Sequence, residues 1–132
     1  MTADEFKALN VNDKWPKAKK ELQQYLTFSG TGPWVTEHVF HPTRKWRLDW
    51  ANVDLKVGIE YDGVTGATAF NRKAGDSSVG HVSVGGVMRD AEKTNEAQLL
   101  GWVVIRVNAK TIKSGDAFTW IERAVERALD NR

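Results

Sequence analysis

Apolar residues recur at helical spacing in three parts of the chain. In residues 12–28 they fall three, four and seven positions apart, and a Ser-Gly-Thr-Gly-Pro run follows at 29–33. Residues 88–101 repeat the pattern and end at Gly101, and residues 118–130 carry one continuous apolar stripe. The pattern therefore predicts three helices.

Other parts of the chain have the pattern of β-strands. They are residues 34–40, 45–51, 56–63 and 102–107. The first three alternate apolar and polar side chains, whereas the last is apolar almost throughout, which is typical of a buried strand. A short turn at 52–54 joins two of them as an antiparallel hairpin. The order α-β-β-β-α-β-α predicts an α/β fold with a mixed sheet, in a single domain over 1–132.

The hairpin is predicted to have one apolar and one charged face, because side chains alternate along a strand. The apolar face comprises Trp46, Leu48, Trp50, Val57, Ile59 and Tyr61. The opposite face comprises Lys45, Arg47, Asp49, Gly58, Glu60 and Asp62. Three carboxylates are thus expected to converge, and such crowded charges favour a hard cation such as Mg²⁺ or Mn²⁺. The alternative is a solvent-exposed strand surface, with Arg47 or Lys45 pairing across the hairpin.

The composition favours a folded protein outside the membrane. The chain has 132 residues, of which 41% are hydrophobic, and six of them are Trp. It has no cysteine, which excludes a disulfide framework and a thiolate zinc site. Because the sequence has neither a signal peptide nor the roughly twenty apolar residues of a membrane helix, we expect a soluble, cytoplasmic protein, in the host cytoplasm if it is viral.

The formal charge of +2 excludes a strongly polyanion-seeking tail and an acidic disordered protein. Basic residues nevertheless gather in the first third of the chain, where they could face phosphates. The alternative is an ordinary solvated surface. A Gly/Ser/Thr-rich stretch at 63–86 is longer than most loops of compact domains, and such loops are commonly functional.

Two runs of the sequence resemble the PD-(D/E)XK nuclease superfamily. They are RLDWANVDLKVGIEYDG at 47–63 and RDAEKTNEAQLLGWVVIRV at 89–107. The resemblance is closest to very-short-patch-repair endonucleases, small phage-type endonucleases and Holliday junction resolvases. It implies a restriction-endonuclease-like α-β-β-β-α-β core, here with an additional C-terminal helix.

The resemblance also implies roles for individual residues. Asp49 matches the first acid of the family motif and Glu60 the second, and the carbonyl of Tyr61 matches the usual backbone ligand. Mg²⁺, with Mn²⁺ as a substitute, is the implied metal. Family members often place a further Glu near a second metal position, for which Glu37 is preferred here over Glu21.

The third position of the motif departs from the family, because Asp62 stands where Lys is the norm. Lys93 in the following helix is the expected substitute and should cross the sheet near Glu60. Very-short-patch-repair enzymes, which the sequence resembles, use a His in the corresponding loop. The resemblance therefore implies His81 as a second candidate, which would position water or protonate the leaving group. Asp62 itself is the third, and Asp90 is either a further acidic contributor or an ordinary helix N-terminal residue.

The resemblance implies a Mg²⁺-dependent endodeoxyribonuclease that selectively cleaves branched DNA or Holliday junctions. It also implies a homodimer, since resolving a junction needs two incisions. The implied DNA-binding residues are Lys17, Lys20, Arg44, Lys45, Arg72 and Lys73. One alternative is a site- or mismatch-directed nicking enzyme. Another is a non-catalytic DNA-binding module with a decayed site. A zinc site of His38, His41 and His81 has little support, because no recognised ligand spacing is present.

Overall fold

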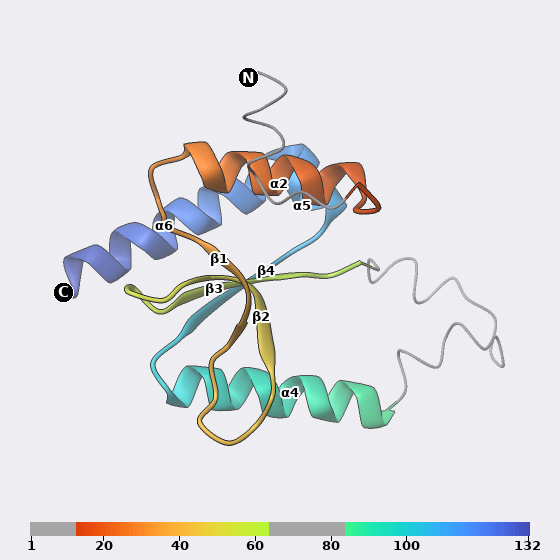
Figure 1. Ribbon diagram of the computed structural model, residues 1–132, viewed down its shortest axis with the longest axis vertical. Helices are drawn as coiled ribbons and strands as arrows, with labels where there is room; N and C mark the ends of the chain where they lie inside the picture. The colour runs from red at the N-terminus through yellow and green to blue at the C-terminus, as the bar shows by residue number, and fades with distance from the viewer. Residues whose placement is uncertain (1–12, 64–83) are drawn as a thin grey trace, which may run out of the picture.

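The computed structural model describes residues 13–63 and 84–132, which form a mixed sheet with helices on both faces (Figure 1). The elements are α2 (Lys17–Phe28), β1 (Val35–Val39), β2 (Arg47–Asn52), β3 (Val57–Tyr61), α4 (Val84–Leu99), β4 (Val103–Val107), α5 (Ala109–Ser114) and α6 (Asp116–Asp130). The prediction of an α/β fold with a mixed sheet is confirmed. Among the described residues, no helix has the length and apolar character needed to cross a membrane.

The strands lie in the order β1-β2-β3-β4. β2 pairs antiparallel with both β1 and β3, and β3 pairs parallel with β4, with Glu60 beside Arg106 in the register. A parallel pair needs a crossover connection, and α4 lies within this one. In Figure 1, α4 covers one face of the sheet while α2, α5 and α6 cover the other.

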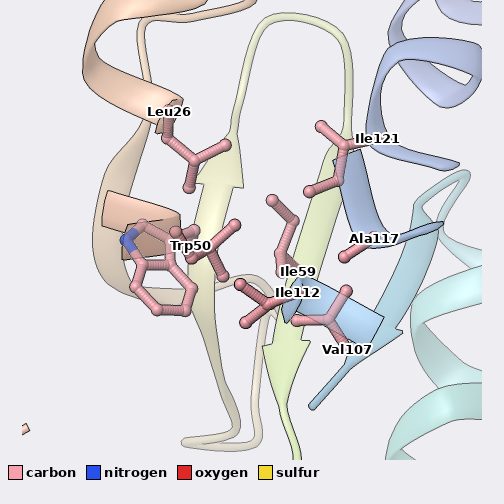
Figure 2. Close-up of a cluster of buried hydrophobic side chains, with 8 residues drawn as sticks. Leu26, Trp50, Ile59, Val107, Ile112, Ala117 and Ile121 are labelled. Atoms are coloured by element: carbon pink, nitrogen blue, oxygen red, sulfur yellow. The ribbon is translucent and has the colours of Figure 1, made fainter. Parts of the chain in front are cut away.

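Each face of the sheet has its own hydrophobic core. The larger core lies under α2, α5 and α6 and comprises Leu22, Leu26, Trp50, Ile59, Val107, Ile112, Ala117 and Ile121 (Figure 2). The smaller core lies under α4 and comprises Leu48, Ala51, Ala97 and Trp102. Burial of a large apolar side chain contributes about 1.5–3 kcal/mol, so the larger core holds more of the fold's stability.

The predicted alternation within β2 is wrong. Leu48 packs in the smaller core and Trp50 in the larger one, so their side chains lie on opposite faces although they are two residues apart. Gly58 permits this arrangement, because a Cβ atom there would come within 2.6 Å of Leu48 Cδ1. Trp46 precedes the strand and stacks on Phe40. The alternation of side chains between the two faces of the sheet is therefore interrupted at Asp49, which lies between the two buried residues.

Other parts of the predicted fold also differ from the structure. The helix predicted over 12–28 begins at Lys17. The helix predicted from residue 88 begins earlier, at Val84. β4 was expected to be a buried strand, but it is the edge strand of the described sheet: residues 103–105 are half-buried, Arg106 is exposed and Val107 is buried. The short helix α5 was not predicted. It begins with a capping box, in which the Asn108 side chain accepts from the Thr111 backbone amide and the Thr111 side chain accepts from that of Asn108.

Candidate active site

Two carboxylates lie side by side where β2 and β3 meet, and we call Asp49 and Glu60 the acidic pair. The paired residues of the two strands run from Asn52 and Val57 to Trp50 and Ile59. Beyond that point, the Asp49 side chain accepts a hydrogen bond from the Tyr61 backbone amide, with Oδ2 2.7 Å from N. A side chain thus bonds the backbone of the neighbouring strand, which fixes the Asp49 carboxylate beside Glu60.

Glu60 is the more perturbed member of the acidic pair. Its side chain is 13% exposed, and burial is the main cause that raises its pKa from 4.5 to about 7. The hydrogen bond from Lys93 opposes this rise, and the negative charge of Asp49 adds to it. The ionised form of Glu60 is thus destabilised mainly by burial, and a cation bound beside it would stabilise that form.

Lys93 reaches the acidic pair from α4. Its Nζ forms an ion pair with Glu60 Oε1, and its side chain is 21% exposed. The structure thus places Lys93 where the sequence predicted it, while its role in catalysis stays a prediction. Three elements, β2, β3 and α4, each supply one of the charged groups of this site.

Asp62 does not join the acidic pair, contrary to the expectation that three carboxylates converge. Its carboxylate binds Arg106, with Oδ1 2.7 Å from Nη2, and Arg106 also binds Asp90 on α4. Among the described residues, no group of three or more His, Asp or Glu side chains could hold a metal ion. Asp62 and Asp90 are therefore partners of an arginine.

Sequence reasoning missed Arg106. The available signal was that Arg106 is the only charged residue in the apolar run of β4. A charge at such a position indicates a partner or a site, because strands of a parallel pair are usually apolar almost throughout. Its partners could not be named, since they lie on β3 and α4.

The other acidic and histidine candidates have contacts outside the acidic pair. Glu37 lies opposite Asp49 in the register of β1 and β2, has a positive φ of 53°, and its carboxylate is 4.0 Å from Arg47, so its second-metal role stays a prediction. Glu21 lies 3.9 Å from Lys17 within α2. His41 accepts from the Arg44 amide at Nδ1 and faces Glu96 at Nε2, and His38 lies against Trp102. His81 lies outside the described residues.

The predicted DNA-binding residues do not form one surface of unengaged cations. Arg44 binds Glu92 at 2.7 Å and stacks on Trp46, with the guanidinium carbon 4.1 Å from the ring centroid. Lys17 pairs with Glu21, as described above. Lys45 is exposed and Lys20 is half-buried. Arg72 and Lys73 lie outside the described residues.

The acidic pair fits a magnesium ion by the chemistry of its donors. Mg²⁺ binds oxygen ligands and commonly uses one or two carboxylates, with water and substrate phosphates in its remaining positions. Asp49 and Glu60 supply two carboxylates, and the Tyr61 carbonyl belongs to the same stretch of backbone. A bound cation would share Glu60 with Lys93. The chain matches no protein-family model, no curated protein and no solved structure.

Proposed function

We propose that this protein is a Mg²⁺-dependent endodeoxyribonuclease that acts on branched DNA such as Holliday junctions. The observation that carries the proposal is the meeting of Asp49, Glu60 and Lys93 from three different elements. Two adjacent carboxylates could hold a metal ion that generates a nucleophilic water. A lysine beside them completes the set of site residues that the resemblance implies.

Asp49, Glu60 and the Tyr61 carbonyl would hold the metal. A bound Mg²⁺ lowers the pKa of water and offsets negative charge on the attacked phosphate. Lys93 extends its ammonium to the edge of this site, where its remaining N–H groups can donate to the attacking water or to a phosphate oxygen. The Tyr61 amide keeps the Asp49 carboxylate in place through its hydrogen bond.

The choice of DNA, and of branched DNA in particular, rests on the resemblance of the two sequence runs to resolvases and repair endonucleases. Resolving a junction requires two incisions, so we propose a homodimer with one site in each copy. Lys17, Lys20, Arg44, Lys45, Arg72 and Lys73 are the proposed phosphate contacts. On DNA binding, Arg44 would exchange Glu92 for a phosphate, which is a charge-assisted pair of the same kind.

A second candidate function is a DNA-binding module without catalysis. The direct ion pair between Lys93 and Glu60 favours it, because that contact also suits a site that serves only the fold. Metal-dependent cleavage separates the two functions.

The experiment is incubation of the purified protein with junction, flap, duplex and single-stranded DNA, each with Mg²⁺, Mn²⁺ or EDTA. We expect cleavage of junctions with either metal and none in EDTA. Asp49→Asn and Glu60→Gln should each abolish cleavage and weaken Mn²⁺ binding, whereas Asp54→Asn, an exposed carboxylate paired with Arg132, should do neither. Binding without cleavage under all conditions would support the second function, and full activity of either acidic-pair variant would refute the first.

A further inference from the structure

A set of ion pairs beside the acidic pair joins α4 to the end of the sheet, and we call Arg106, Asp62 and Asp90 the arginine clamp. Arg106 donates to Asp62 through Nη2, 2.7 Å from Oδ1, and through Nε, 3.3 Å from Oδ2. It also lies on Asp90, with Nη2 3.1 Å from Oδ2 and Nη1 3.3 Å from Oδ1. One planar guanidinium thus holds two carboxylates in two-point contacts, as arginine can and lysine cannot.

The arginine clamp acts close to Lys93. Asp90 and Lys93 lie three residues apart on α4, so their side chains are neighbours on the helix surface. Residues 88–92 of α4 are exposed, and the buried residue that α4 contributes to the smaller core is Ala97. The turn that carries Lys93 is therefore held by polar contacts, and the bond from Arg106 to Asp90 fixes it relative to β4.

The arginine clamp also determines what Asp62 does. Asp62 lies directly after the end of β3, two residues beyond Glu60, and it binds Arg106, which is the register partner of Glu60. A free carboxylate there would add negative charge beside Glu60 and compete for Lys93. Its pairing with Arg106 removes that competition.

We propose that Arg106 is a positioning residue for the reaction. By holding Asp90 it sets Lys93 on Glu60, and by holding Asp62 it keeps that carboxylate from the acidic pair. The inference rests on the proposed nuclease function. On this inference, Asp62, which stands where the resembled motif has Lys, supports Lys93 through its contact with Arg106.

The first test is the steady-state kinetics of junction cleavage by Arg106→Gln. We expect kcat to fall by about tenfold or more and KM to change by less than about threefold, because the arginine acts on the placement of Lys93 and not on DNA affinity. Arg106→Lys should recover part of the rate, since it keeps the charge. The matched control is Arg132→Gln, which breaks a 2.8 Å pair with Asp54 and should leave both constants unchanged. An unchanged kcat in Arg106→Gln, or an equal loss in the control, would overturn the proposal.

The second test is a double-mutant cycle with Lys93→Ala. If Arg106 acts through Lys93, adding Arg106→Gln to Lys93→Ala should lower kcat by less than about twofold further. If the two losses multiply in full, Arg106 acts independently of Lys93 and the proposal is wrong.

The same cycle can be measured without metal or DNA, by urea unfolding in EDTA. The effects of Arg106→Gln and Lys93→Ala on the unfolding equilibrium constant should depart from multiplicativity by about threefold or more, because the two side chains hold one turn of helix. Multiplicative effects would overturn the positioning role. If the wild-type protein binds DNA but never cleaves it, the nuclease proposal fails, and this cycle still decides whether Arg106 positions Lys93.

Discussion

Replacing Glu60 with Gln should remove a distinct pH dependence from the stability of the metal-free protein. Burial and Asp49 raise the pKa of Glu60 to about 7, against the opposing effect of Lys93. The folded protein then binds a proton more tightly at this site than the unfolded chain does. This stabilisation is fully present below pH 4.5, the ordinary pKa of the side chain, and it is lost as the pH rises through about 7.

The size of the effect follows from the two pKa values. The full difference corresponds to about 3 kcal/mol, of which about 2.5 kcal/mol falls between roughly pH 5 and pH 8. The assay is urea unfolding of wild type and Glu60→Gln in EDTA across this range. The wild type should lose about 2.5 kcal/mol relative to the variant as the pH rises.

The matched control is Glu126→Gln, which changes an exposed carboxylate of α6 and should follow the wild-type curve. Parallel curves for wild type and Glu60→Gln would show that the combined effect of burial, Asp49 and Lys93 leaves the pKa of Glu60 unchanged. In that case our account of a buried Glu60 carboxylate with a raised pKa would be wrong.

Three further predictions concern catalysis and packing. Lys93→Ala should lower the kcat of cleavage by about a hundredfold with little loss of DNA affinity, and normal cleavage together with an inactive His81→Ala would transfer the role to the histidine. Gly58→Ala should lower the free energy of unfolding by about 1–3 kcal/mol through overpacking against Leu48. The loss should be smaller in a Leu48→Ala background, and equal losses in urea unfolding would contradict the contact. Lys56→Gly should be about 1 kcal/mol more stable than Lys56→Ala, because residue 56 has a φ of 55°, and the reverse order of melting temperatures would refute that explanation.

Local pattern was enough to predict most helices and strands of this fold. The last helix was predictable because its apolar stripe is continuous, although Leu129 at its end is exposed while Ile121 and Val125 are buried. The helix predicted over 12–28 exists but begins at Lys17, directly after Pro16, which suits the residue just before a helix or its first turn. These features depend on residues that are neighbours in the sequence.

The predictions that were wrong concern features that depend on packing between distant segments. Leu48 turns to the α4 face because Gly58 leaves space on the adjacent strand and Ala97 covers it from the helix. Strand alternation alone has no means of predicting that interruption. Asp62 was placed with the acidic pair for the same reason, since only the fold brings Arg106 beside it.

The sequence predicted the two carboxylates and the lysine of the candidate site, but it did not predict the contacts that hold them in place. Asp49 and Glu60 were predicted from strand alternation and from the resemblance to a family motif, and Lys93 from that resemblance and from the position of its helix after the loop. The bond from the Tyr61 amide to Asp49 and the arginine clamp were not predictable, because they depend on the rotation of α4 and the end of strand pairing.

The parallel pairing of β3 with β4 has a consequence for the order of folding. The β1-β2-β3 meander is made of contacts between neighbours in sequence, whereas Val57 pairs with Val103 only after a long intervening segment has closed. Non-local closure of this kind is slow, so we expect the meander to form early and α4 and β4 to dock late. The carboxylates of Asp49 and Glu60 would then come together well before Lys93 and Arg106 arrive. Interrupted-refolding experiments should accordingly find that a chain with a formed hairpin still lacks the site until its last kinetic step.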